Sequence, residues 1–172
     1  MRFRGEGFRA HDPRWSWAPL SGAGAALRGR RFNWPGLETL YLSLSLETAF
    51  REVSAGFAHR LTPQVLCVYE VDCEDVIDLR SPAVRHEQGV DLADLACAWA
   101  LDLDAGRTPA SWRVVRRLLE GGAAGIAVPS FANGAGPGDH NLVLWRWGPD
   151  PPHRVTVHDP ERSLPRDGSS WK

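Results

Sequence analysis

The spacing of the hydrophobic residues changes abruptly at Ser45, about a quarter of the way along the chain. From residue 40 to 46 the leucines at even positions fall on one side and Tyr41 falls on the other, which is typical of a half-buried strand. After Ser45 the apolar residues recur at three- and four-residue spacing, which predicts a helix capped by Ser45 with Glu47 in its first turn. The stripe that we expect to face the core consists of Ala49, Phe50, Val53 and Phe57.

Three polar or aromatic side chains of this strand and helix point away from the leucines. Asn33-Trp34-Pro35-Gly36 is a predicted turn, and Arg31 precedes it directly. Tyr41 lies on the non-leucine face of the strand, and Glu52 lies on the flank of the helical stripe. Each residue taken alone is typical of a protein surface. Together they place a cation, an aromatic ring and a carboxylate on one side of one unit.

These residues also carry a family resemblance. The turn around Arg31 has the pattern G-x-R-[FW]-N-x-P-G, and it is followed by a Tyr-Leu-Ser strand, an E-T-A-x-x-E helix start and a later Pro-Ser. In order and spacing these motifs resemble the RES-domain family, the toxin halves of bacterial toxin–antitoxin pairs. The resemblance covers residues 5 to 160, which is nearly the whole chain.

The resemblance implies the split-sheet core of ADP-ribosylating toxins with NAD as substrate in the cleft. By family position, Glu52 is the expected catalytic carboxylate and Arg31 a catalytic cation that also holds the diphosphate. The other expected NAD contacts are Arg9, Tyr41, Ser130 and Asn141.

The chemistry of NAD cleavage suits these residue types. Breaking the bond between ribose and nicotinamide develops positive charge on the ribose ring, which a carboxylate such as Glu52 can stabilise. The forked donors of Arg31, and of Arg9, fit a diphosphate, and Tyr41 can stack on the charged nicotinamide ring. Ser130 and Asn141 would fix orientation through hydrogen bonds.

The acceptor of ADP-ribose has two interpretations within the family. Some members resemble mono-ADP-ribosyltransferases that modify a protein, including phosphoribosyl-pyrophosphate synthetase, and others resemble NAD phosphorylases or hydrolases. The W-P-G turn and the block PSFANGAGPG…NLVLW look more like the transferases, so we favour transfer to a protein. A third hypothesis is a non-catalytic module that binds a nucleotide or docks a partner.

Control by a partner is also expected. The resemblance implies a cognate antitoxin that blocks free activity. Seven arginines lie within residues 2–31 against only Glu6 and Asp12, and we expect acidic groups of the partner to meet them in the cleft.

The remaining pattern predicts an α+β fold built on antiparallel sheet, because short strands and turns surround a few helices without regular βαβ alternation. Asp91 is the expected cap of a helix of about ten residues, and Ser111 that of a helix ending at Gly121-Gly122. The glycine- and proline-rich segment 131–138 follows a strand end and is a candidate wall of the active site. Further strands are expected in residues 1–10, 64–71, 76–79, 123–128, 141–147 and 153–157.

Composition favours a single domain, residues 1–172, with a tail after about residue 161 that is loosely attached. A formal charge of −1 argues against a general nucleic-acid binder. Three cysteines without C-x-x-C spacing suggest a reducing cytoplasm, and no apolar run predicts export or membrane insertion. The six histidines lack H-x-x-x-H spacing, so we expect no metal.

Overall fold

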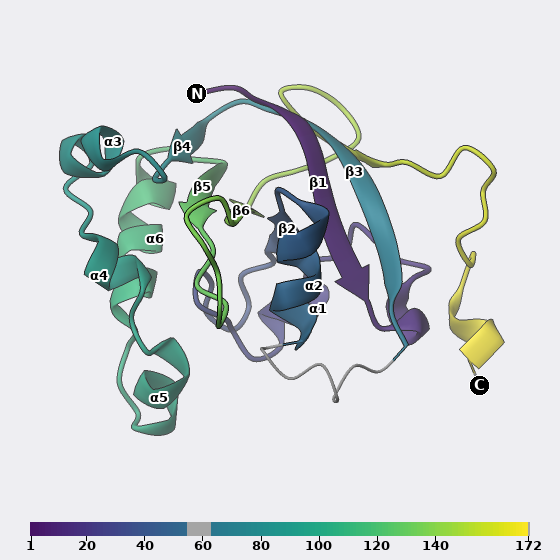
Figure 1. Cartoon of the computed structure of the whole chain (residues 1–172), viewed down its shortest axis with the longest axis horizontal. Helices are drawn as coiled ribbons and strands as arrows, with labels where there is room; N and C mark the ends of the chain where they lie inside the picture. Colours follow the sequence, from purple (N-terminus) through teal and green to yellow (C-terminus); the bar gives the residue numbers. More distant parts are fainter. Residues whose placement is uncertain (55–62, 172) are drawn as a thin grey trace.

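A computed structural model describes residues 1–54 and 63–171. Within these residues a seven-stranded sheet has the order β4-β5-β6-β2-β1-β3-β7, antiparallel except for the β4–β5 pair (Figure 1). The strands are β1 (Phe3–His11), β2 (Leu40–Ser43), β3 (Val65–Cys73), β4 (Val76–Asp78), β5 (Gly125–Pro129), β6 (His140–Leu144) and β7 (His153–Val157).

Helices connect these strands. The α-helices are α1 (Ala23–Ala26), α2 (Leu46–Ser54), α3 (Pro82–Glu87), α4 (Leu92–Leu95), α5 (Trp99–Asp104) and α6 (Ala110–Glu120), and the 3-10 turns are η1 (Pro13–Trp15) and η3 (Gly168–Trp171). No helix among the described residues is long and apolar enough to cross a membrane.

The sheet has a seam between β1 and β2. These two strands share one register pair, Phe8 with Ser43, whereas β1 pairs with β3 along its whole length. The seam divides the sheet into β4-β5-β6-β2 and β1-β3-β7, and α2 packs against β1 and β2 in front of it (Figure 1). The predicted α+β fold on a split antiparallel sheet is confirmed.

Each face of the sheet carries its own core. Val143 and Ile126 face α4 and α6 in the first core, where Val115 and Leu118 cover them. Leu40 and Leu42 belong to the second core on the opposite face, together with Tyr69, Leu142 and Val155. The leucine alternation therefore separated the two sides of β2 correctly, but the strand is not half-buried as expected, because its odd-numbered residues lie on the face of the first core.

The helix boundaries require corrections. The Ser45 hydroxyl accepts from the Thr48 amide and caps α2 as predicted, and Ala49 is buried as expected. Phe50 is half exposed, and Thr48 is buried beside Ala49 on the inward face. The Val53 side chain and Phe57, which complete the expected stripe, lie outside the described residues and side chains.

The two predicted later helices also differ from expectation. The helix after Asp91 is two short helices, α4 and α5, separated at residues 96–98. Pro109 occupies the N-cap of α6, and Ser111 lies buried inside this helix. The predicted end of that helix at Gly121-Gly122 is correct.

Candidate active site

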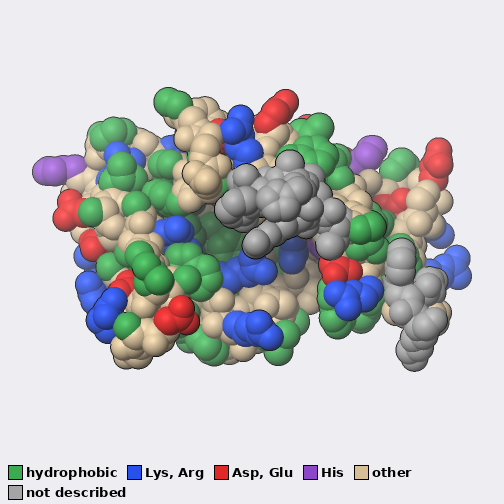
Figure 2. All heavy atoms as spheres, turned by 60° about the horizontal axis from the view of Figure 1, so that its bottom comes forward, with side chains coloured by type: hydrophobic (Ala, Val, Ile, Leu, Met, Phe, Trp, Pro, Cys, Tyr) green, Lys and Arg blue, Asp and Glu red, His purple; other side chains and the backbone are tan. Residues whose placement is uncertain are grey.

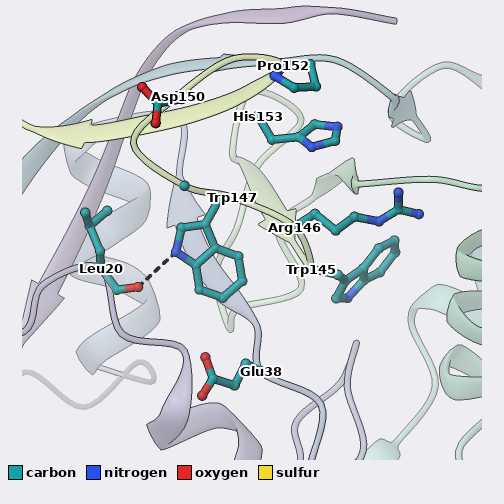
Figure 3. Close-up of a pocket in the computed structure, with 9 residues that line it drawn as sticks. Leu20, Glu38, Trp145, Arg146, Trp147, Asp150, Pro152 and His153 are labelled. Atoms are coloured by element: carbon teal, nitrogen blue, oxygen red, sulfur yellow. Dashed lines mark hydrogen bonds between the residues drawn. The ribbon is translucent and has the colours of Figure 1, made fainter.

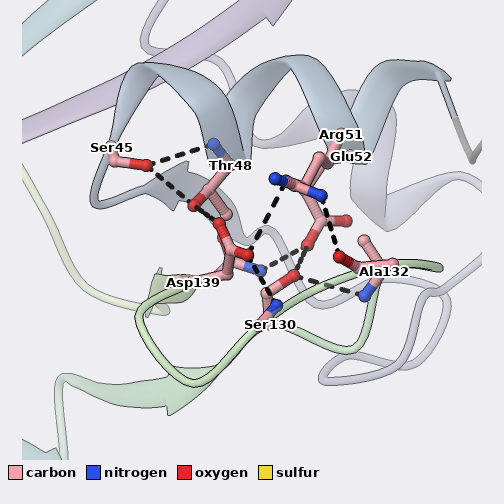
Figure 4. Close-up of polar contacts among 10 residues, drawn as sticks. Ser45, Thr48, Arg51, Glu52, Ser130, Ala132 and Asp139 are labelled. Carbon is pink, nitrogen blue, oxygen red and sulfur yellow. Dashed lines mark hydrogen bonds and ion pairs between the residues drawn. The ribbon is translucent and has the colours of Figure 1, made fainter.

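Helix α2 presents Glu52 to the segment that joins β5 to β6. The side chain of Glu52 is exposed, and its Oε1 atom accepts two hydrogen bonds, from Ser130 Oγ at 2.7 Å and from Asn141 Nδ2 at 2.6 Å (Figure 4). Ser130 follows β5 directly and Asn141 belongs to β6, so both ends of the connecting loop hold the same carboxylate oxygen. The two bonds orient the Glu52 carboxylate through Oε1.

Asn141 has one further feature of interest. Its Oδ1 atom is buried and has no hydrogen-bond partner among the described residues. Because Nδ2 donates to the carboxylate, the amide orientation is determined and Oδ1 must be the acceptor. A buried acceptor without a donor is uncommon in folded proteins, and this one belongs to the side chain that donates to Glu52.

The Arg31 turn is held rigidly from three directions. The backbone carbonyls of Arg30, Arg31 and Phe32 accept hydrogen bonds from the side chains of Trp112, Ser111 and Trp145 respectively. Gly29 adopts φ +74°, and a Cβ there would lie about 3.0 Å from both Asn33 and Trp112. These contacts stabilise the turn that positions the Arg31 side chain.

The Arg31 guanidinium is partly buried beside the same loop. Its Nη1 donates to the carbonyls of Leu95 at 3.1 Å and Cys97 at 2.6 Å, and its Cζ lies 4.9 Å from the centre of the Phe131 ring. Burial lowers the pKa of Arg31, and the charge of Glu52 is among the nearby groups that oppose this shift. Arg31 and Glu52 are therefore close enough for their charges to interact. Two residues that are adjacent in sequence contact them: Ser130 donates to Glu52, and Phe131 lies against Arg31.

Tyr41 contributes to the turn through its hydroxyl. The hydroxyl donates to Asn33 Oδ1 at 2.8 Å and accepts from the Phe32 amide at 3.1 Å, while Asn33 itself is fully buried. Burial raises the pKa of Tyr41, so the phenol stays neutral. The ring packs against the first core and remains partly accessible, on the same face of the sheet as Asn141. Only the ring, not the hydroxyl, is available to a ligand.

Arg9 lies apart from the other five predicted site residues. It pairs in register with Cys67, a member of the second core, and so points to the opposite face of the sheet from Asn141. Its Nη1 donates to the carbonyls of Pro19 and Ser21, and burial lowers its pKa. The structure brings Arg31, Tyr41, Glu52, Ser130 and Asn141 to one side and separates Arg9 from them.

Three of the seven arginines of residues 2–31 form ion pairs away from the candidate site. Arg2 and Arg4 both bind Asp72, and Arg14 binds Asp12. These three cations are committed to local ion pairs, so the cationic character of the site comes from the turn that carries Arg31. The face that comes forward in Figure 2 is hollowed near its centre, and basic side chains gather along the lower margin of this hollow.

A separate hollow of about 590 Å³ lies beyond the other end of β6 (Figure 3). The indole nitrogens of its two tryptophans already donate to protein carbonyls, Trp147 to Leu20 and Trp145 to Phe32. Neither Glu52 nor Arg31 lines it, and its charged groups are of mixed sign. We therefore place the candidate site at Glu52, whose carboxylate is held by Ser130 and Asn141 and whose charge influences Arg31. The residues that line the separate hollow are Leu20, Glu38, Trp145, Arg146, Trp147, Gly148, Asp150, Pro152 and His153.

Comparison with known proteins gives a direct family assignment. The model of the RES domain matches residues 6–167. The chain belongs to the RES domain family. Among solved structures, this RES domain is similar to a chain of the M. tuberculosis MbcT-MbcA toxin-antitoxin complex, with a TM-score of 0.61 and 23% sequence identity over 92% of this chain and 84% of that one. A search of curated proteins gives no match.

Phe131 belongs to the expected 131–138 wall, but its place under Arg31 was not foreseen. Sequence reasoning missed three further residues of this candidate site: Ser111 holds the Arg31 carbonyl, and Thr48 and Asp139 link α2 to the loop beside Glu52. The position of Phe131 directly after Ser130 is the one local signal that could have suggested its role. The others depend on contacts between residues far apart in the sequence.

Proposed function

We propose that this RES domain is the toxin of a toxin–antitoxin pair, and that it cleaves the nicotinamide–ribose bond of NAD and transfers ADP-ribose to a cellular protein. The observation that carries the proposal is the Glu52 carboxylate, held at Oε1 by Ser130 and Asn141 and placed within charge range of Arg31. Such an oriented carboxylate opposite a forked cation suits a substrate that carries a diphosphate and develops positive charge at a sugar.

In the proposed reaction the bond between ribose C1′ and the nicotinamide nitrogen breaks, and its electron pair leaves with nicotinamide. The ribose becomes oxocarbenium-like, and Glu52 stabilises this charge with the Oε2 atom that faces away from Ser130 and Asn141. The acceptor nucleophile then bonds to C1′ and gives up its proton. Arg31 would hold the diphosphate through the guanidinium nitrogens other than Nη1, which is engaged by the Leu95 and Cys97 carbonyls.

The Tyr41 ring and the Phe131 ring are the aromatic groups near this pair of charges. Tyr41 shares a sheet face with Asn141, and Phe131 lies against Arg31. We assign the nicotinamide stacking role to Tyr41, as the sequence suggested, through its ring face. Arg9 has no part in this arrangement, because it points to the other face of the sheet.

The acceptor is tested with NAD labelled in its adenylate half. The purified chain is incubated with this NAD and a cell lysate, and the products are separated into protein, ADP-ribose and ADP-ribose phosphate. Transfer to protein, with phosphoribosyl-pyrophosphate synthetase as one candidate target, predicts label in a protein band. Label in ADP-ribose phosphate or in free ADP-ribose would instead assign the chain to phosphorolysis or hydrolysis, and intact NAD would leave a non-catalytic binding module.

A cognate antitoxin is the proposed partner of this toxin. Its blocking segment would enter between the Arg31 turn and the 131–138 loop, where a carboxylate of the partner can pair with Arg31 in place of the NAD diphosphate. Contact between Phe131 and Arg31 supports the view that these two elements form one site. The similarity in fold to a chain of a toxin-antitoxin complex adds support from outside the chain.

A further inference from the structure

A second polar link joins α2 to the loop, one helical turn before Glu52. Thr48 is fully buried, and its Oγ1 donates to Asp139 Oδ1 at 2.6 Å (Figure 4). The Ser45 hydroxyl lies 2.8 Å from Thr48 Oγ1 and also caps the helix. The cap of α2, its inward face and the loop are thus connected through one hydroxyl.

Asp139 in turn connects the two groups that hold Glu52. Its carbonyl accepts from the Ser130 amide at 2.7 Å, which closes the loop between β5 and β6. Its Oδ2 accepts from the Gly136 amide at 2.7 Å and lies 3.6 Å from Arg51 Nε. Asn141 follows two residues later. A displacement of Asp139 would therefore carry Ser130 and Asn141 with it.

The two linked residues of α2 and their two partners at the start of β6 have similar spacing along their chains. Thr48 and Glu52 are four residues apart on a helix, a rise of about 6 Å on one face. Asp139 directly precedes β6 and Asn141 is the second residue of that strand, so the two are at most about 6–7 Å apart along the chain. Thr48 meets Asp139 and Glu52 meets Asn141, so two links of comparable spacing join the helix to the start of β6.

We propose that Thr48 and Asp139 are positioning residues, whose buried link sets where α2 holds the Glu52 carboxylate relative to Ser130 and Asn141. The inference rests on the proposed cleavage of NAD at Glu52. An apolar residue such as valine would fill the buried position 48 with nearly the same shape as threonine. The Thr48 hydroxyl instead contacts Ser45 and donates to Asp139, and the contact with Asp139 is the one that reaches the loop beside Glu52.

The test compares Thr48→Val, which removes the hydroxyl at constant shape, with Thr48→Ser, which keeps it. Because misplacement of a catalytic group by about 1 Å can cost up to about 10²-fold in rate, we expect Thr48→Val to lower kcat for nicotinamide release at least about tenfold. The KM for NAD should stay within about twofold, since Arg31 lies on separate elements. Thr48→Ser should recover most of kcat. Thr108→Val, at an exposed threonine, is the matched control.

A folded Thr48→Val protein with the wild-type kcat would overturn the inference, as would a Thr48→Ser protein that is as slow as Thr48→Val. If Thr48→Val does not fold, Asp139→Ala removes the acceptor for Thr48, and its kcat must fall at constant KM. A wild-type chain that releases no nicotinamide refutes the proposed function instead. In that case amide hydrogen exchange tests the Thr48–Asp139 link separately from catalysis. Faster exchange at Ser130 and Ala132 in Thr48→Val supports the link, and unchanged exchange refutes it.

Discussion

Replacing Glu52 with glutamine tests the site with the least disturbance of its geometry. The amide oxygen of Glu52→Gln can take the place of Oε1 and still accept from Ser130 and Asn141, so the side chain keeps its orientation. The change removes the negative charge that would stabilise the ribose cation. Loss of one such electrostatic group costs about 10²–10³-fold in rate, which corresponds to about 2.7–4 kcal/mol.

Stability should change little, because Glu52 is exposed and surface substitutions are usually within about 0.5 kcal/mol. The assay measures nicotinamide release at saturating NAD together with the melting temperature and growth arrest in cells. Glu47→Gln, an exposed glutamate on the same helix, is the control and should behave as wild type. A folded Glu52→Gln protein that releases nicotinamide at the wild-type rate would make Glu52 an ordinary surface residue and refute the proposed site.

Three further predictions concern binding, control and pH. Arg31→Lys should weaken NAD binding although the charge is kept, because an ammonium group cannot make a two-pronged bond to phosphate; an unchanged affinity by titration would contradict this role. The antitoxin should compete with NAD, so its apparent inhibition constant should rise with NAD concentration; inhibition independent of NAD would exclude occlusion of the cleft. Burial and the charge of Arg9 lower the pKa of His11 from 6.5 to about 4, so the unfolded chain binds the proton more readily. Stability should therefore fall between pH 6.5 and pH 4, by at most about 3 kcal/mol, and His11→Gln should flatten this part of a denaturation series.

The part of the fold that follows local periodicity could be predicted from the sequence. The alternation at Leu40 and Leu42 gave the strand and its buried side, and the Ser45 cap gave the start of α2. The split antiparallel sheet followed from the family resemblance as much as from the pattern. Elements of this kind depend on neighbours within a few residues, which the sequence displays directly.

The errors arose where distant residues decide the structure. The helix expected after Asp91 is interrupted at residues 96–98, where Arg31 takes the carbonyls of Leu95 and Cys97 from more than sixty positions away. Ser111 resembles a cap in sequence, but its hydroxyl is used by the Arg31 carbonyl. These contacts satisfy backbone groups that a local pattern would assign to the helix itself.

The site was predictable in its residue types and less so in its contacts. Ser130 and Asn141 were expected to fix orientation through hydrogen bonds to NAD, and the contact that the sequence did not indicate is their shared bond to Glu52. Tyr41 was assigned only to stacking on nicotinamide, and its hydroxyl also holds the turn through Asn33. The orientation of Arg9 depends on its register with Cys67. Residue spacing along a chain does not contain this information, because it is set when strands pair.

The most direct test of the account is the release of free nicotinamide from NAD by the purified chain, with a cell lysate present as a source of acceptors and the Glu52→Gln protein as the background. We predict that nicotinamide appears with the wild-type chain in proportion to its concentration, and that the amount of ADP-ribose bound to protein matches it. No nicotinamide above the Glu52→Gln background would contradict the claim that the carboxylate held by Ser130 and Asn141 cleaves NAD.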